Sequence, residues 1–138
     1  MEIKLSVIMK TYATVIGVVK FNEKILILKR NYKRHSSPNK WQPVSGFIKE
    51  RESAEDAILR EVKEETGLDG KIIKSGKSFE VTDIWGRWII IPFLVSVDSE
   101  KVKIDLEEHS EYKWIKPEET VKFDCVDGIF EDLKSVGI

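Results

Sequence analysis

Three glutamates, Glu61, Glu64 and Glu65, stand close together in a segment whose apolar residues recur with helical spacing. With about 100° of rotation per residue, their side chains share an arc of roughly 100° on such a helix. Glu61 and Glu65 form a like-charged i,i+4 pair, which costs a helix roughly 0.2–0.5 kcal/mol. Carboxylate oxygens are the ligands that Mg²⁺ prefers, and Mg²⁺ often completes its shell with substrate phosphates. The spacing therefore indicates either a site for a hard divalent cation or a charged surface stripe.

The helix that carries these acids has signals at both ends. Ser53 with Asp56 three residues later is a capping-box pattern, and Gly67 supplies the C-terminal stop. We expect the carboxylates to border the face that packs on a sheet, because the apolar residues lie on the neighbouring arc: Ile58, Leu59 and Val62. The residues expected to face solvent are Asp56, Arg60 and Lys63.

The acids belong to a longer pattern, GFIKERESAEDAILREVKEETGL, which runs from Gly46 to Leu68. This pattern resembles the signature of the Nudix hydrolase family. That signature is Gly, five residues, Glu, seven residues, Arg-Glu, an apolar residue, any residue, Glu-Glu, any residue, Gly and an apolar residue. The residues that fill its specified positions are Gly46, Glu52, Arg60, Glu61, Val62, Glu64, Glu65, Gly67 and Leu68.

The resemblance implies a Nudix-type α/β/α sandwich, an α+β fold in which this segment forms a loop, a helix and a second loop. The metal ligands that it implies are the backbone carbonyl of Gly46 and the carboxylates of Glu61, Glu64 and Glu65. The cofactor is then Mg²⁺, with Mn²⁺ as a substitute. Glu52 and Arg60 resemble the pair that orients these acids from outside the coordination shell. The alternative for Arg60 is an ordinary solvated arginine.

Two further residues are implied by the resemblance. In EEHSEYKW, which offers Glu107, Glu108 and Glu111, we choose Glu108 as an acid that approaches the metal from a later loop; its alternative is a plain loop carboxylate. Arg30, at the end of ILILKR, stands where relatives place a phosphate-contacting arginine. We expect His109 to be an incidental loop histidine. The cations expected to be ordinary members of a basic loop are Lys29, Lys33, Arg34 and Lys40.

The elements that must position these residues follow from hydrophobic patterning. Residues 12–20 and 24–30 are expected to form a hairpin of buried strands, followed by a loop over residues 31–40. Further strands are expected at 41–44 (ended by Ser45-Gly46), 71–81, 87–97 and 112–115, with a connector at 117–120. Val126, Ile129, Phe130 and Leu133 are spaced like one face of a second helix. The whole predicts a twisted, mixed or antiparallel sheet with two helices packed on it.

Composition limits the class of protein. A chain of 138 residues without repeats or linkers fits one domain over residues 1–138. A net charge of -1 argues against binding to nucleic acid or to an anionic membrane. MEIKLSVIMK has no signal-peptide pattern, and a single cysteine, Cys125, fits a reducing compartment, so we expect a cytoplasmic protein. We expect Cys125 to be a small buried residue just before or within the last helix, and the protein to be a monomer or a homodimer.

The substrate is less defined than the reaction. WQPVSG and EEHSEYKWIKPEE resemble the branch that hydrolyses deoxynucleoside triphosphates and dihydroneopterin triphosphate. We therefore expect a nucleotide or pterin triphosphate to be cut to a monophosphate and pyrophosphate. The general base is either Glu61 or Glu108. The alternatives are a dinucleoside polyphosphate or ADP-ribose hydrolase, and a non-catalytic nucleotide-binding Nudix module.

Two positions depart from the branch or stand outside the signature. Arg51 replaces the glycine that usually precedes the first glutamate of the signature, which could change the loop. Trp85-Gly86-Arg87-Trp88 is either a platform on which a base stacks or, as we favour, a hairpin turn with aromatic strand residues.

Overall fold

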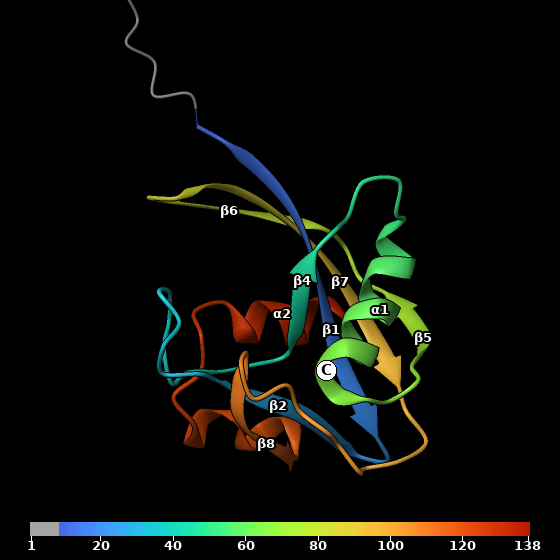
Figure 1. Ribbon diagram of the computed structural model, residues 1–138. Helices are drawn as coiled ribbons and strands as arrows, with labels where there is room; N and C mark the ends of the chain where they lie inside the picture. Colours follow the sequence, from blue (N-terminus) through green and yellow to red (C-terminus); the bar gives the residue numbers. More distant parts are fainter. Residues whose placement is uncertain (1–8) are drawn as a thin grey trace, which may run out of the picture.

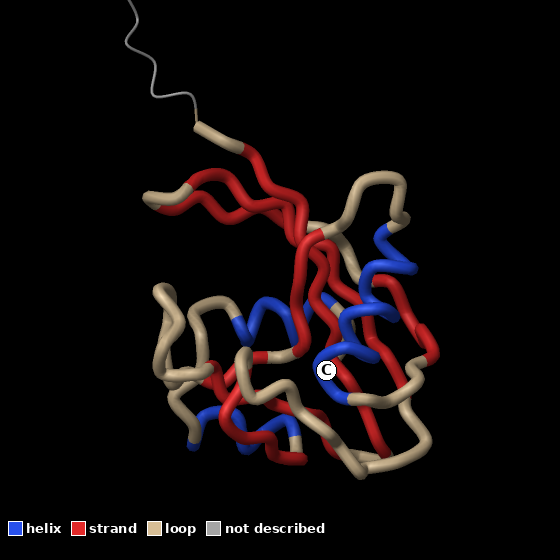
Figure 2. Tube along the Cα trace, viewed as in Figure 1, coloured by secondary structure: helices blue, strands red, loops and turns tan. Residues whose placement is uncertain are grey.

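The computed structural model describes residues 9–138 (Figures 1 and 2). The segment MEIKLSVI lies outside these residues. The prediction that the N-terminus has no signal-peptide pattern falls mostly on this segment. The strands are β1 (Thr11–Phe21), β2 (Lys24–Arg30), β3 (Trp41–Gln42), β4 (Val44–Phe47), β5 (Lys71–Ser75), β6 (Phe79–Asp83), β7 (Gly86–Ser96) and β8 (His109–Ile115). The helices are α1 (Ala54–Thr66), the short 3₁₀ helix η1 (Pro117–Lys122) and α2 (Ile129–Ser135).

The strands form one mixed sheet around the long pair β1 and β7. These two strands run parallel, from Thr11 beside Arg87 to Lys20 beside Ser96. β4 pairs antiparallel with the middle of β1, and β5 and β6 pair antiparallel with the two halves of β7. β2 leaves β1 at the hairpin turn and pairs with β8 and β3. β6 and the start of β7 extend away from the body of the domain as a hairpin (Figure 1).

Successive side chains of β1 point to opposite faces of the sheet, so the core has two layers. Val15 and Val19 pack with Ile58 and Val62 of α1. Val18, which points to the opposite face of the strand, packs with Ile129 and Leu133 of α2. The two helices therefore cover opposite faces of the sheet, and the expected α/β/α sandwich is confirmed.

The first helix has the ends that the sequence predicts. The Oγ of Ser53 accepts a hydrogen bond from the backbone N–H of Asp56 at 3.0 Å. Gly67 adopts the left-handed conformation, with φ of 74°, and its N–H donates to the carbonyl of Lys63. These caps satisfy orphan backbone groups at both ends, so the position of the acids along the chain is fixed locally.

Several boundaries differ from the prediction. Ser45-Gly46 does not end the strand, because β4 continues beside β1 to Phe47. The run 71–81 is divided into β5 and β6, which pair with different parts of β7. The connector at 117–120 is helical. Cys125 does precede the last helix, but it is half-buried rather than buried.

The buried face of the second helix differs from the predicted one. α2 begins at Ile129, not at Val126, and Phe130 is 56% exposed. The residues that face the sheet are Ile129, Asp132, Leu133 and Val136. This face has the helical spacing i, i+3, i+4, i+7, but a carboxylate takes one of its four places. No helix of residues 9–138 is long and apolar enough to cross a membrane.

Candidate active site

Arg60 is the centre of a hydrogen-bonded cluster of acidic side chains in the candidate active site. Its guanidinium binds both oxygens of Glu52, from Nε at 2.7 Å and from Nη2 at 2.9 Å. Nη1 donates to Glu61 at 2.8 Å and to Glu64 at 3.2 Å, and Nη2 also donates to the carbonyl of Phe47 at 3.0 Å. The expectation that Arg60 faces solvent is wrong, because only 20% of its side chain is exposed.

Glu52 is held on its other side by the backbone. The N–H of Lys49 donates to Oε1 of Glu52 at 3.0 Å. The hydrogen bonds from Arg60 and Lys49 lower the pKa of Glu52 to about 2, and Glu52 and Glu61 together raise the pKa of Arg60. Both groups are thus ionised, and the loop that precedes α1 is tied to the middle of that helix.

Gly46 lies directly under the carboxylate of Glu61. A Cβ atom at Gly46 would collide with Cγ, Cδ and Oε1 of Glu61. β4 holds Gly46 in register with Val15 of β1, and α1 packs on the same sheet through Ile58. The glycine therefore allows the carboxylate to lie against the backbone of the strand, which a larger residue would prevent.

The three candidate metal-binding glutamates of α1 lie in different environments. The Glu64 side chain is 52% exposed, that of Glu61 is 15% exposed, and Glu65 is 5% exposed as a residue. Burial and the adjacent carboxyl of Glu61 raise the pKa of Glu65 well above its usual value. The Oε2 atom of Glu65 is buried and has no hydrogen-bond partner among the described residues.

A buried polar chain connects Glu65 to the basic side of the site. His109 Nε2 lies 3.7 Å from Oε1 of Glu65 and 3.1 Å from Nε2 of Gln42. Oε1 of Gln42 accepts a hydrogen bond from Nη1 of Arg30 at 2.9 Å. His109 is completely buried at the start of β8, so it is not an incidental loop residue. Burial, with the charges of Arg34 and Arg30, lowers the pKa of His109 to about 4, which keeps the ring neutral near pH 7.

Arg30 and Glu108 reach the site from the second strand and the later loop. The Arg30 side chain is buried, and its guanidinium also donates to the carbonyl and hydroxyl oxygens of Ser36, each at 3.0 Å. Burial and the nearby charge of Arg34 lower its pKa. Glu108 accepts a hydrogen bond from Arg34 at 2.8 Å. Arg34 therefore lies beside the candidate acid and is more than the ordinary loop cation that the sequence predicts.

These side chains surround one open cleft of about 590 Å³, which we call the arginine cleft. Of the predicted residues it is lined by Arg30, Gly46, Arg60, Glu61, Glu64 and Glu108. Glu52 and Glu65 lie behind its wall. Residues that sequence reasoning did not assign to a site also line it: Arg34, Gln42, Lys49 and Trp88. Gln42 lies in WQPVSG, which gave no role for this residue, and Trp88 ends the Trp85–Trp88 segment, for which base stacking was the less favoured prediction.

Trp85 and Trp88 have different surroundings. Trp85 is 66% exposed at the turn between β6 and β7. It lines neither the arginine cleft nor the cleft between α2 and the β6–β7 hairpin. Trp88 lines the cleft and stacks on Tyr12 of β1, with ring centroids 4.6 Å apart. Of these two tryptophans, Trp88 is thus the one that a substrate in the cleft can contact.

The chemistry of the acids suits a hard cation, although they do not converge on one point. Across residues 9–138, no three His, Cys, Asp or Glu side chains are arranged to hold a metal ion. Arg60 instead occupies one oxygen each of Glu61 and Glu64. All side-chain donors are carboxylate oxygens, and the unpartnered buried Oε2 of Glu65 is an acceptor that a cation would satisfy. The residues present therefore fit a divalent ion.

Comparison with known proteins identifies the family of this chain. The family model described as NUDIX domain matches residues 11–129. The chain belongs to the Nudix family. Members of this family are hydrolases of phosphoanhydrides and generally use divalent metal ions. The predicted Nudix signature thus lies in a Nudix domain.

Individual Nudix relatives are distant. The chain is 32% identical over 108 residues to Nudix hydrolase 5 of Arabidopsis thaliana, covering 75% of this chain and 35% of that protein. The chain thus spans about a third of the length of this relative. The MutT protein of Methanosarcina mazei Go1 has a similar structure, with a TM-score of 0.79, 24% identity and 92% of both chains covered. A C. elegans Ap4A hydrolase gives a TM-score of 0.70 at 20% identity, covering 91% of this chain and 93% of that one.

Proposed function

We propose that this protein is a magnesium-dependent Nudix pyrophosphohydrolase that uses water to cleave the diphosphate linkage of a nucleotide-type substrate. The hydrogen bonding of Arg60 to Glu52, Glu61 and Glu64 is the observation that supports this most. It brings the acids of the signature to the wall of a cleft that also carries Arg30 and Arg34. We propose that the enzyme acts in the cytoplasm as a monomer or a homodimer.

The residues that would hold the Mg²⁺ are Glu61, Glu64, Glu65 and, through its carbonyl, Gly46. The ion would supply charge neutralisation and Lewis acidity at the phosphates. Glu52 and Arg60 then act as positioning residues, because Glu52 fixes Arg60 and Arg60 holds Glu61 and Glu64. An arginine bound to one carboxylate in a bidentate manner has a fixed plane, so its remaining donor holds a second carboxylate in a fixed direction.

The phosphates are bound by cations that the chain already positions. The guanidinium of Arg30 is fixed by Ser36 and Gln42, and Arg34 stands on the same wall beside Glu108. Phosphoryl transfer depends on such placement and charge more than on covalent chemistry by the protein. Glu61 and Glu108 both line the cleft, and either carboxylate can accept the proton of the attacking water. A candidate whose Gln variant keeps nearly full turnover at saturating Mg²⁺ is not that base.

We favour a (deoxy)nucleoside or pterin triphosphate, cut between the α and β phosphates to give a monophosphate and pyrophosphate. The resemblance of WQPVSG and EEHSEYKWIKPEE to that branch supports this choice, and so does the position of Gln42 and His109 from these segments beside the cleft. A dinucleoside polyphosphate, as in the name of the C. elegans relative, is the first alternative substrate.

The experiment that tests this function is product analysis by ion-exchange chromatography. The protein is incubated with Mg²⁺ and nucleoside triphosphates, dihydroneopterin triphosphate, diadenosine tetraphosphate or ADP-ribose. Glu64→Gln should abolish turnover, whereas Glu55→Gln, the same change on the exposed first turn of α1, should not. Monophosphate and pyrophosphate from a triphosphate support the proposal. Cleavage of only a dinucleotide or ADP-ribose contradicts the branch, and turnover of nothing favours a non-catalytic binding module.

A further inference from the structure

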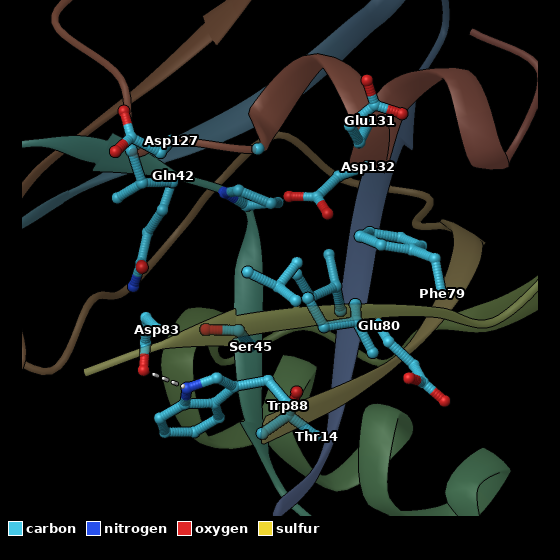
Figure 3. A pocket seen from close by; sticks show the side chains of 16 residues that line it. Thr14, Gln42, Ser45, Phe79, Glu80, Asp83, Trp88, Asp127, Glu131 and Asp132 are labelled. Atoms are coloured by element: carbon cyan, nitrogen blue, oxygen red, sulfur yellow. Dashed lines mark hydrogen bonds between the residues drawn. The ribbon is translucent and has the colours of Figure 1, made fainter. Parts of the chain in front are cut away.

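A second cleft of about 460 Å³ adjoins the arginine cleft (Figure 3). The two share five lining residues: Thr14, Ile16, Gln42, Ser45 and Trp88. The second cleft lies between α2 and the hairpin of β6 and β7. A molecule that occupies both clefts therefore passes over the middle of β1, at Thr14 and Ile16, and beside Gln42, Ser45 and Trp88.

The floor of this second cleft is the sheet face that α2 leaves uncovered. Thr14 and Ile16 of β1 point to the same face as Val18, which α2 covers. Trp88 and Ile90 extend this floor on β7, and the Trp88 indole is fixed by a hydrogen bond from Nε1 to Asp83 at 3.0 Å. A floor of half-buried apolar side chains next to an aromatic ring suits a flat ring better than a charged group.

Asp132 is the polar group that faces this floor. It is 3% exposed, and its carboxylate points into the cleft, whereas that of Glu131 is turned away (Figure 3). Within residues 9–138, its side chain makes no hydrogen bond or ion pair. Burying an unpaired carboxylate is costly, and an apolar residue at this place would continue the face formed by Ile129, Leu133 and Val136. A carboxylate in the first turn of a helix is favoured by the helix dipole, but an exposed position gives the same gain, so the burial of Asp132 points to a ligand.

Charge separates the two clefts. The second cleft is lined by five acids and by no lysine or arginine, so we call it the acidic cleft. These acids are Glu80, Asp83, Asp127, Glu131 and Asp132. The arginine cleft holds Arg30, Arg34, Lys49 and Arg60, together with the acids Glu61, Glu64 and Glu108, beside which Mg²⁺ would bind. A triphosphate is repelled by the first set and attracted by the second, whereas a ring rich in N–H donors is favoured by the first.

We propose that the acidic cleft binds the ring of the substrate and that Asp132 accepts hydrogen bonds from two adjacent N–H donors on it. This inference rests on the proposed function, since it assumes that the phosphates occupy the arginine cleft. The chemical class is a 2-amino-4-oxopyrimidine ring, in which a ring N–H stands next to an exocyclic amino group. Guanine and pterin both contain this unit.

The choice of this ring follows from the two acceptor oxygens of a carboxylate. Two parallel N–H···O bonds to one carboxylate are stronger and more directional than one bond. Adenine and cytosine place a ring acceptor next to their amino group, and that acceptor would face a carboxylate oxygen. Thymine and uracil place carbonyl oxygens on both sides of their single N–H. Each of these rings therefore leaves one oxygen of Asp132 unpaired or opposed.

The test compares ring preference in the wild type and in Asp132→Asn. Hydrolysis of dGTP, dihydroneopterin triphosphate, dATP and dTTP is measured with Mg²⁺. We expect dGTP or dihydroneopterin triphosphate to be preferred, and the better of the two identifies the source of the ring. In Asp132→Asn, KM for that substrate should rise about 10- to 100-fold with kcat little changed. KM for dATP should fall, because an amide offers one donor and one acceptor. Glu118→Gln, which removes an exposed acid of η1 outside both clefts, should keep the wild-type preference.

Calorimetric titration with the product monophosphates separates this inference from the proposed hydrolysis. Tighter binding of dGMP or dihydroneopterin monophosphate than of dAMP, lost in Asp132→Asn, supports the acidic cleft even if no triphosphate is hydrolysed. Equal binding of all rings, or a preference that Asp132→Asn leaves unchanged, overturns it even if hydrolysis is found.

Discussion

Arg60 binds Glu52 through two hydrogen bonds, from Nε to Oε2 at 2.7 Å and from Nη2 to Oε1 at 2.9 Å. This pairing sets the plane of the guanidinium, so that Nη1 points at the next two acids of the signature, Glu61 and Glu64. The loop before α1 and the middle of α1 are thus connected through one planar group.

Replacing Arg60 by lysine should test this connection. An ammonium group keeps the charge but cannot bind Glu52 in a bidentate manner while also reaching Glu61. We expect kcat to fall roughly 10- to 100-fold and the Mg²⁺ concentration for half-maximal rate to rise. Steady-state rates across a Mg²⁺ series measure both. Arg51→Lys, a change at an exposed arginine nearby, is the control. Wild-type Mg²⁺ dependence in Arg60→Lys would show that the charge alone suffices.

Replacing Gly46 by alanine should displace Glu61. The added methyl group collides with the end of the Glu61 side chain, so this carboxylate must leave its position against the strand. We expect kcat to fall at least about 10-fold, while the melting temperature changes by only a few degrees. A Glu61→Ala background removes the three atoms nearest to the added methyl group, so a double-mutant cycle should show strong coupling. Additive effects would contradict the contact.

Replacing Arg51 by glycine should stabilise the protein. Arg51 has φ of 65°, a left-handed conformation that costs a non-glycine residue roughly 1–2 kcal/mol. Glycine loses more entropy on folding, which offsets part of this gain. We expect the free energy of unfolding to rise about 0.5–1 kcal/mol in urea titrations. Arg51→Ala keeps the Cβ atom and should not raise the free energy of unfolding. An equal rise in both variants would show that the cause is the loss of the arginine side chain and not the backbone conformation.

Replacing Trp88 by alanine should weaken substrate binding. Its ring lines both clefts, and stacking of a base on an aromatic residue contributes about 1–3 kcal/mol. We therefore expect KM to rise roughly 10-fold or more, with a smaller effect on kcat. Trp85→Ala is the matched control, because this tryptophan lies at the exposed turn. An unchanged KM in Trp88→Ala, with the fold intact by circular dichroism, would exclude stacking on that ring.

Asp132 should make stability depend on pH. Burial and then the charge of Glu131 raise the pKa of its carboxyl from 3.8 to about 7. A pKa that is higher in the folded state stabilises the fold at acidic pH, and that contribution is lost as the pH rises from about 4 through 7. Relative to Asp132→Asn, the wild type should lose about 2–3 kcal/mol of unfolding free energy between pH 5 and pH 8. Urea titrations at several pH values measure this, and parallel pH profiles would contradict it.

Signals within short stretches of sequence predicted helix α1 and the hairpin of β1 and β2. The caps at Ser53 and Gly67 fix α1, and the apolar periods of β1 and β2 fix the hairpin. The division of residues 71–81 into two strands could not be predicted in this way. The run 71–81 has a continuous strand composition, and only its pairing with two separate parts of β7 divides it into β5 and β6.

Side-chain direction was the other limit of the sequence. A helical wheel gives only the direction in which a side chain leaves the helix. The long side chain of Arg60 turns back to Glu52 and to the carbonyl of Phe47, so Arg60 does not face solvent as the wheel predicts. The wheel for α2 failed because it admitted only apolar residues to the buried face, and Asp132 occupies one of those places. His109 has no other histidine nearby in the sequence, and nothing in the sequence indicated that Glu65 and Gln42 would lie beside it.

The two helices lie on opposite faces of the sheet, and this has an evolutionary consequence. The acids of the Nudix signature are carried by α1, and Asp132 is carried by α2, in a separate core layer. A substitution on the inner side of α2 alters the acidic cleft without moving any residue that packs under the signature glutamates. If the acidic cleft binds the ring as we propose, ring selectivity can change between descendants of this chain while the signature residues are inherited unchanged.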